Sequence, residues 1–137
     1  MGVLRENRYV NDYVKNNLPN ALSYGRMRVG RKLTNIGIER LWPDKILIED
    51  GKVIIIEAKI KPTSAAIGQL NEYARLFPET PEFFFVKDYT IRKMILTTRP
   101  DRVIEEMAAA SGIEYVVYLP DWLKFELEAA LEEEQGL

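Results

Sequence analysis

The sequence predicts an α/β (α+β) fold in which helices flank a mixed central sheet. Segments with helical and strand periodicity follow one another in the order αβββαβ and then βαβα. Asp50-Gly51, between two apolar runs, indicates a β-hairpin. The chain has 137 residues, 47% of them hydrophobic, which is the size and composition of one globular domain covering 1–137.

Local signals place the individual elements. A helix is expected over 3–17, because Leu18-Pro19-Asn20 would end it. Thr63 or Ser64 suits the start of a second helix that runs to about residue 77. Pro100-Asp101 and Asp121 suit the starts of two more, the first of them ending near Gly112. Alternating or continuous apolar runs predict strands at 23–32, 44–49, 52–59, 82–87, 93–98 and 114–119.

The composition limits the chemistry. The chain contains neither cysteine nor histidine, so disulfides, thiolate metal sites, cysteine nucleophiles and Ser-His-Asp triads are excluded. A bound metal would have only oxygen ligands, which favours Mg²⁺, Mn²⁺ or Ca²⁺. The N-terminus is too polar for a secretory signal and no apolar run approaches ~20 residues. We therefore expect a cytoplasmic protein with no membrane partner.

The hairpin predicts a pair of opposed carboxylates. A two-residue loop at Asp50-Gly51 pairs Glu49 with Lys52 and, counting outward, Asp44 with Glu57. Opposed residues of an antiparallel pair point to the same face with Cβ atoms ~5 Å apart, and Lys59 returns to that face two residues later. Two opposed carboxylates repel each other unless a cation neutralises them. The alternative is a solvated strand end with a Glu–Lys pair.

Pro43-Asp44, followed after the hairpin by Glu57-Ala58-Lys59, resembles the motif of the PD-(D/E)xK nuclease superfamily. The αβββαβ order resembles its restriction-endonuclease-like core, and the likeness covers about residues 3–88. The resemblance implies Mg²⁺- or Mn²⁺-dependent hydrolysis of DNA phosphodiesters by a metal-activated water. It implies that Asp44, Glu57 and the Ala58 carbonyl bind the metal, and that Lys59 orients or activates the attacking water.

Two further features extend this resemblance. Gln69 and Tyr73 are four residues apart, on one helix face, and resemble the Gln-x-x-x-Tyr motif of the RecB-like branch. Glu6 lies on the apolar face of the first helix, where a carboxylate needs a partner. In many family members a glutamate on this helix points to the metal, which makes Glu6 a candidate ligand. Glu39 is the rival candidate.

Charge is distributed unevenly along the chain. Residues 1–68 carry 12 Lys/Arg and 7 Asp/Glu, whereas residues 69–137 carry 7 and 14. A basic half suggests an anionic partner. Within it, one stretch is a candidate DNA-backbone contact: Tyr24, Arg26, Arg28, Arg31 and Lys32. The alternative is a solvated edge strand whose charges block aggregation.

We thus expect a metal-dependent DNA nuclease, and the sequence leaves open both endo- versus exonuclease activity and DNA versus RNA as the substrate. The alternative is a catalytically inactive nuclease-fold module for DNA binding or protein interaction. In the terminal helix, Trp122, Phe125 and Ala129 are expected to form the packing face of an amphipathic cover, with a homodimer contact as the other reading.

Overall fold

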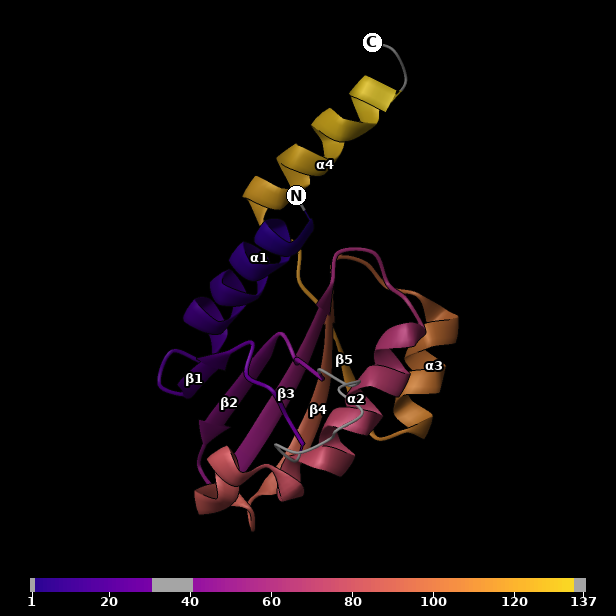
Figure 1. The fold of residues 1–137 in the computed structure, drawn as a ribbon. Coiled ribbons are helices and arrows are strands. Elements are labelled where there is room, and N and C mark those ends of the chain that lie inside the picture. The colour runs from indigo at the N-terminus through magenta and orange to yellow at the C-terminus, as the bar shows by residue number, and fades with distance from the viewer. Residues whose placement is uncertain (1, 31–40, 135–137) are drawn as a thin grey trace.

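A computed structural model describes residues 2–30 and 41–134 of the chain. At its centre lies a five-stranded sheet in the order β1-β2-β3-β4-β5 (Figure 1). The strands are β1 (Leu22–Gly25), β2 (Lys45–Glu49), β3 (Lys52–Lys59), β4 (Thr90–Thr97) and β5 (Ile113–Val117). The pairs β1–β2 and β2–β3 are antiparallel, whereas β3–β4 and β4–β5 are parallel. The sheet is therefore mixed, as predicted.

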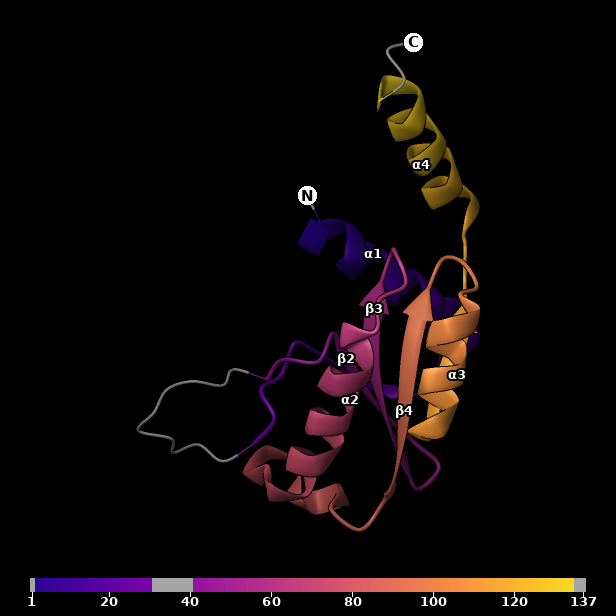
Figure 2. The same cartoon turned by 90° about the vertical axis from the view of Figure 1, so that its right-hand side faces the viewer.

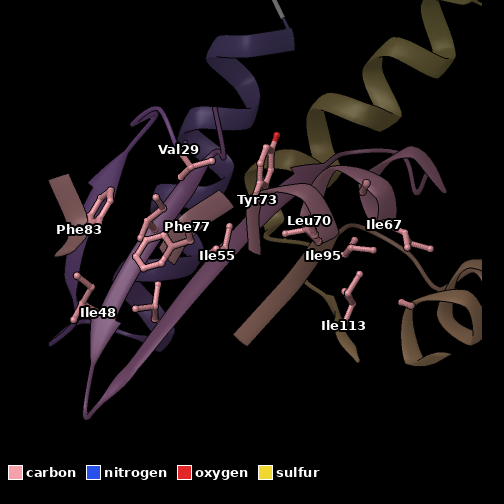
Figure 3. Packing of buried hydrophobic residues seen from close by; sticks show 14 of the residues in the cluster. Val29, Ile48, Ile55, Ile67, Leu70, Tyr73, Phe77, Phe83, Ile95 and Ile113 are labelled. Carbon is pink, nitrogen blue, oxygen red and sulfur yellow. The ribbon is translucent and has the colours of Figure 1, made fainter. Parts of the chain in front are cut away.

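Helices cover both faces of this sheet (Figure 2). The helices are α1 (Gly2–Asn17), α2 (Ala65–Leu76), α3 (Arg102–Ala110) and α4 (Asp121–Glu134), with 3₁₀ turns η1 (Phe77–Glu79) and η2 (Pro81–Val86). On one face, α2 and α3 pack over a core that includes Ile55, Leu70 and Ile95 (Figure 3). On the other face, α1 packs over Leu47, Ile54 and Ile56. No helix in the described part of the chain is long and apolar enough to cross a membrane.

The hairpin has the predicted register. Glu49 pairs with Lys52 and Lys45 with Ile56. Asp50 and Gly51 have φ angles of 49° and 74°, as a type I′ turn requires at both central positions. The register prediction on which the carboxylate pair rests is therefore confirmed.

The predicted strand 82–87 is wrong. These residues lie in and just after η2, which begins with Pro81 and buries Phe83 and Val86 at a three-residue spacing. That spacing belongs to a 3₁₀ turn, whereas an apolar run such as this one also suits a buried strand. The fourth strand of the αβββαβ core is instead β4, which begins at Thr90. The C-terminal extension is consequently αβα and not βαβα.

The predicted strand 23–32 is too long. β1 ends at Gly25 because Arg26 has a φ of 35°, outside the β region. Val29 returns to the sheet only as an isolated bridge to Leu41. Arg26 and Arg28 therefore lie beyond the strand, on a segment that no longer alternates between two faces.

The predicted packing face of α4 is only partly correct, because Trp122 packs against the core whereas Phe125 and Ala129 are exposed. The helix projects beyond the sheet (Figures 1 and 2), and its buried residue is Leu123, whereas Phe125 is 70% exposed. Trp122 lies beneath the guanidinium of Arg8, which is 3.8 Å from the ring centroid. Apolar periodicity alone therefore includes two residues, Phe125 and Ala129, that lie on the exposed side of the helix.

Candidate active site

Two acidic side chains meet at one end of the β2–β3 hairpin. Asp44 directly precedes β2, and Glu57 lies near the end of β3, opposite it by the register. Only 9% of Asp44 and 4% of Glu57 is exposed. Ile55 packs beneath α2, and because side chains alternate along a strand, Glu57 and Lys59 share that face. The carboxylates therefore lie between the sheet and α2.

Asp44 is held by one backbone and one side-chain donor. The Ala58 N–H donates to Asp44 Oδ2 at 2.8 Å. Arg26 Nη1 lies 3.4 Å from Asp44 Oδ1, and about half of the arginine side chain remains exposed to solvent. The Ala58 bond fixes the aspartate beside β3, although Asp44 lies outside the β2 ladder.

Glu57 has one partner on each oxygen. Lys59 Nζ lies 3.2 Å from Oε2, and the Tyr73 hydroxyl donates to Oε1 at 3.2 Å. The Tyr73 ring is packed in the core under α2, and its hydroxyl points away from the apolar side chains (Figure 3). The arrangement joins β3 and α2 through a single carboxylate.

The electrostatics of the pair reflect burial. Desolvation, followed by the negative charge of Asp44, raises the pKa of Glu57 to about 7, and Lys59 partly opposes the shift. Desolvation also raises the pKa of Asp44, against the lowering effects of the Ala58 hydrogen bond and Lys59. Because burial disfavours the charged form of both carboxyl groups, a bound proton or a nearby positive charge stabilises the pair.

The donor set fits a hard divalent cation. The Ala58 N–H points towards Asp44. Within a strand, the N–H and the carbonyl of one residue point to the same side. The Ala58 carbonyl therefore also points from β3 towards the Asp44 side. Mg²⁺ is commonly held by one or two carboxylates with several waters retained. Within 2–30 and 41–134, no group of three or more acidic side chains is arranged to hold a metal. Two carboxylates, a carbonyl and water would thus form the shell.

Glu6 lies near Asp44 and Glu57 but does not form a group of three carboxylates with them. Burial raises the pKa of Glu6, the charge of Asp44 raises it further, and Lys59, Arg26 and a hydrogen bond from the Ile60 backbone lower it. Its carboxylate is therefore within electrostatic reach of the site, on the α1 side. The rival candidate, Glu39, lies outside the described residues.

The two motif residues of α2 behave differently. Tyr73 contacts Glu57 directly, and its hydroxyl also lies 3.5 Å from the Trp42 carbonyl. Gln69, one turn earlier, is half-buried, and its Oε1 is buried with no hydrogen-bond partner in the described part of the chain. Of this pair, the structure brings only Tyr73 into hydrogen-bonding contact with a carboxylate.

The residues of the predicted DNA-backbone contact lie in different surroundings. Arg26 and Arg28 line a groove of about 360 Å³ next to Trp42. Tyr24 instead packs edge-on against Phe83, with ring centroids 5.3 Å apart, and so belongs to the core margin. Arg31 and Lys32 lie outside the residues that the structure describes.

Sequence reasoning missed two features near the site. The buried Thr98 donates to the Ile60 carbonyl at 2.6 Å, which ties the ends of β3 and β4 together just beyond Lys59. Lys61, Arg99 and Lys124 line a separate groove of about 420 Å³. They come from three distant segments, so no pattern along the sequence could group them.

Comparison with known proteins identifies the fold. No protein-family model and no curated protein sequence matches the chain. The chain is similar to a repair endonuclease from Pyrococcus abyssi, with a TM-score of 0.57 and 14% identity over 81% of this chain and 46% of that chain. A lower TM-score of 0.49, with 15% identity over 81% of this chain and 43% of that chain, relates it to EndoMS in a complex with double-stranded DNA.

The chain has a restriction-endonuclease-like fold. The likeness to the repair endonuclease, together with the five-stranded mixed sheet and its flanking helices, establishes this architecture. The chain spans less than half the length of either structure.

Proposed function

We propose that this chain is a metal-dependent DNA nuclease of the PD-(D/E)xK type. The observation that carries the proposal is the meeting of Asp44, Glu57 and Lys59 at the end of the β2–β3 hairpin, with both carboxylates buried. The nuclease fold of a repair endonuclease gives independent support. An intact set of motif residues favours an active enzyme over an inactive binding module.

Asp44, Glu57 and the Ala58 carbonyl would hold Mg²⁺ or Mn²⁺. Such a cation stabilises charge that develops on the phosphate and lowers the pKa of the attacking water. Lys59, paired with Glu57 at 3.2 Å, can orient that water or stabilise the pentavalent transition state. Glu6 would add negative charge from the α1 side.

The RecB-like assignment is part of the proposal and depends on α2. Tyr73 positions Glu57 through its hydroxyl, and Gln69 offers a buried acceptor one turn away. Arg26 and Arg28, outside the strand and beside the site, would contact the DNA backbone without reading its sequence.

A cleavage panel tests the proposed function. Purified protein is incubated with linear, circular, single-stranded and branched DNA in Mg²⁺, Mn²⁺ or EDTA, alongside the Glu57→Gln variant. We expect hydrolysis that needs a divalent cation and is abolished by the substitution. Tight DNA binding without cleavage would instead indicate the inactive module. Light scattering on the same samples tests the alternative reading of the terminal helix as a homodimer contact.

A further inference from the structure

We infer that the groove lined by Trp42, Arg26 and Arg28 binds one unpaired nucleotide of the DNA substrate, its base stacked on Trp42. The inference rests on the proposed nuclease function and adds to it a preference for DNA with an unpaired strand. The groove has a volume of about 360 Å³, within the usual range for small-molecule sites, and its other lining residues are Met27, Gly30 and Glu82.

Trp42 presents an accessible aromatic surface inside this groove. Its side chain belongs to a residue that is 37% exposed, although tryptophan is highly buried on average. Pro43, which is buried, follows it and fixes the backbone between Trp42 and Asp44. The ring is therefore placed two residues from a carboxylate of the candidate active site.

Two contacts join the groove to that site. The Trp42 carbonyl lies 3.5 Å from the Tyr73 hydroxyl, which also binds Glu57. Arg26 Nη1 lies 3.4 Å from Asp44 Oδ1. A nucleotide held in the groove would thus be adjacent to the phosphodiester at the carboxylates.

The chemistry of the lining favours an unpaired nucleotide. In a duplex, neighbouring bases cover both faces of each base, whereas an unpaired base can stack on an aromatic side chain. The cationic side chains of Arg26 and Arg28 suit the phosphate of the same nucleotide. Arg26 also has a φ of 35°, a left-handed conformation that costs a non-glycine residue free energy and is enriched at functional sites.

Tryptophan fluorescence tests the inference. The chain has two tryptophans, and Trp122→Phe leaves Trp42 as the sole one. In EDTA, which prevents cleavage, this variant is titrated with a short oligothymidylate, an abasic oligomer of equal length and a blunt duplex. We expect saturable quenching by the oligothymidylate, because its bases stack on Trp42, and little quenching by the abasic oligomer, which offers only phosphates.

Substitution of the ring provides a second measurement. Trp42→Leu should weaken binding of the oligothymidylate by about tenfold, in line with the usual contribution of one stacked base. Trp42→Phe should restore part of the affinity, and Trp122→Leu should leave it unchanged. Circular dichroism and thermal unfolding identify any variant that does not fold, in which case Trp42→Phe and the fluorescence titration decide.

Four outcomes would overturn the inference. Equal quenching by the abasic oligomer would mean that phosphates alone are bound, and equal quenching by the blunt duplex would mean that the ring contacts paired DNA. Cleavage of DNA with unchanged Trp42 emission would remove the nucleotide site and leave the nuclease proposal intact. Absence of binding to every DNA, together with absence of cleavage in Mg²⁺ and Mn²⁺, would refute both.

Discussion

Tyr73 and Glu57 belong to different elements, yet a hydrogen bond of 3.2 Å joins the tyrosine hydroxyl on α2 to the glutamate Oε1 on β3. The tyrosine ring lies in the core (Figure 3), and its hydroxyl donates to Glu57. The packing of α2 on the sheet therefore sets the orientation of a candidate metal ligand.

Tyr73→Phe should lower cleavage with little effect on folding. The ring is retained, so the free energy of unfolding should change by about 1 kcal/mol, while loss of a group that orients a ligand typically costs about tenfold or more in activity. Single-turnover cleavage and urea unfolding measure the two effects, with Tyr89→Phe as the control.

Gln69→Ala should also lower cleavage. Full activity of both α2 variants, Tyr73→Phe and Gln69→Ala, would contradict the RecB-like assignment.

Asp44→Ala should weaken binding of Mn²⁺ by at least about tenfold, because it removes one of the two proposed carboxylate ligands. Isothermal calorimetry compares it with the wild type and with Asp88→Ala, which removes an exposed carboxylate from a distant loop. Ca²⁺ should bind the wild type without supporting cleavage. Equal Mn²⁺ affinity in all three proteins would remove the metal site from this position.

Lys59→Ala should reduce the single-turnover cleavage rate by about a hundredfold and leave DNA affinity within about twofold, if the ammonium acts on the water or the transition state. Lys15→Ala, an exposed substitution on α1, should leave both unchanged. A loss of affinity with an unchanged rate would show that Lys59 binds DNA and does not act in the chemical step.

The metal-free protein should lose stability as pH rises. Burial and Asp44 raise the pKa of Glu57 to about 7 from its ordinary 4.5, so the folded state holds this proton more tightly than the unfolded state. The resulting stabilisation is fully present below pH 4.5 and is lost as pH rises through 7. Urea unfolding in EDTA should show that Glu57→Gln removes part of this dependence, by roughly 1–3 kcal/mol. Parallel pH profiles for the two proteins would contradict the assigned shift.

Changing Arg26 and Arg28 together to alanine should weaken DNA binding uniformly across sequences. The slope of log affinity against log salt should fall by roughly two phosphate contacts. Arg102→Ala, a control on an exposed and distant residue, should leave the slope unchanged. An unchanged slope in the double variant would place the DNA backbone elsewhere, with the groove of Lys61, Arg99 and Lys124 as the next surface to test.

The parts of the fold that local rules determine were predictable from sequence. The turn at Asp50-Gly51 has strict backbone requirements, so it specified the register that places Asp44 opposite Glu57. The start of α3 followed from capping chemistry, since the Asp101 side chain accepts a bond from the Ile104 N–H, and α4 begins at the predicted Asp121. In these places, one or two residues decide the structure.

The remaining parts depend on tertiary contacts. Phe83 and Val86 form a 3₁₀ turn because it buries them against the core, and their sequence suits a strand equally well. The Arg26–Asp44 contact requires β1 to end at a left-handed residue, which no pattern at Arg26 indicates. The partners of Tyr73 likewise depend on how α2 sits on the sheet.

The β2–β3 hairpin has a consequence for how the site tolerates insertions and deletions. Val53 to Ala58 are all buried, with apolar residues on both faces, so hydrophobic patterning alone would scarcely penalise a slip of one position. The turn residues Asp50 and Gly51, ~20 Å away along the strand, therefore carry most of the information that aligns the carboxylates. Adding one residue between Asp44 and the turn would turn Asp44 to the opposite face, whereas adding two would preserve its side. Even then Asp44 would face Lys59 and not Glu57, so the carboxylate pair depends on the number of residues between Asp44 and the turn.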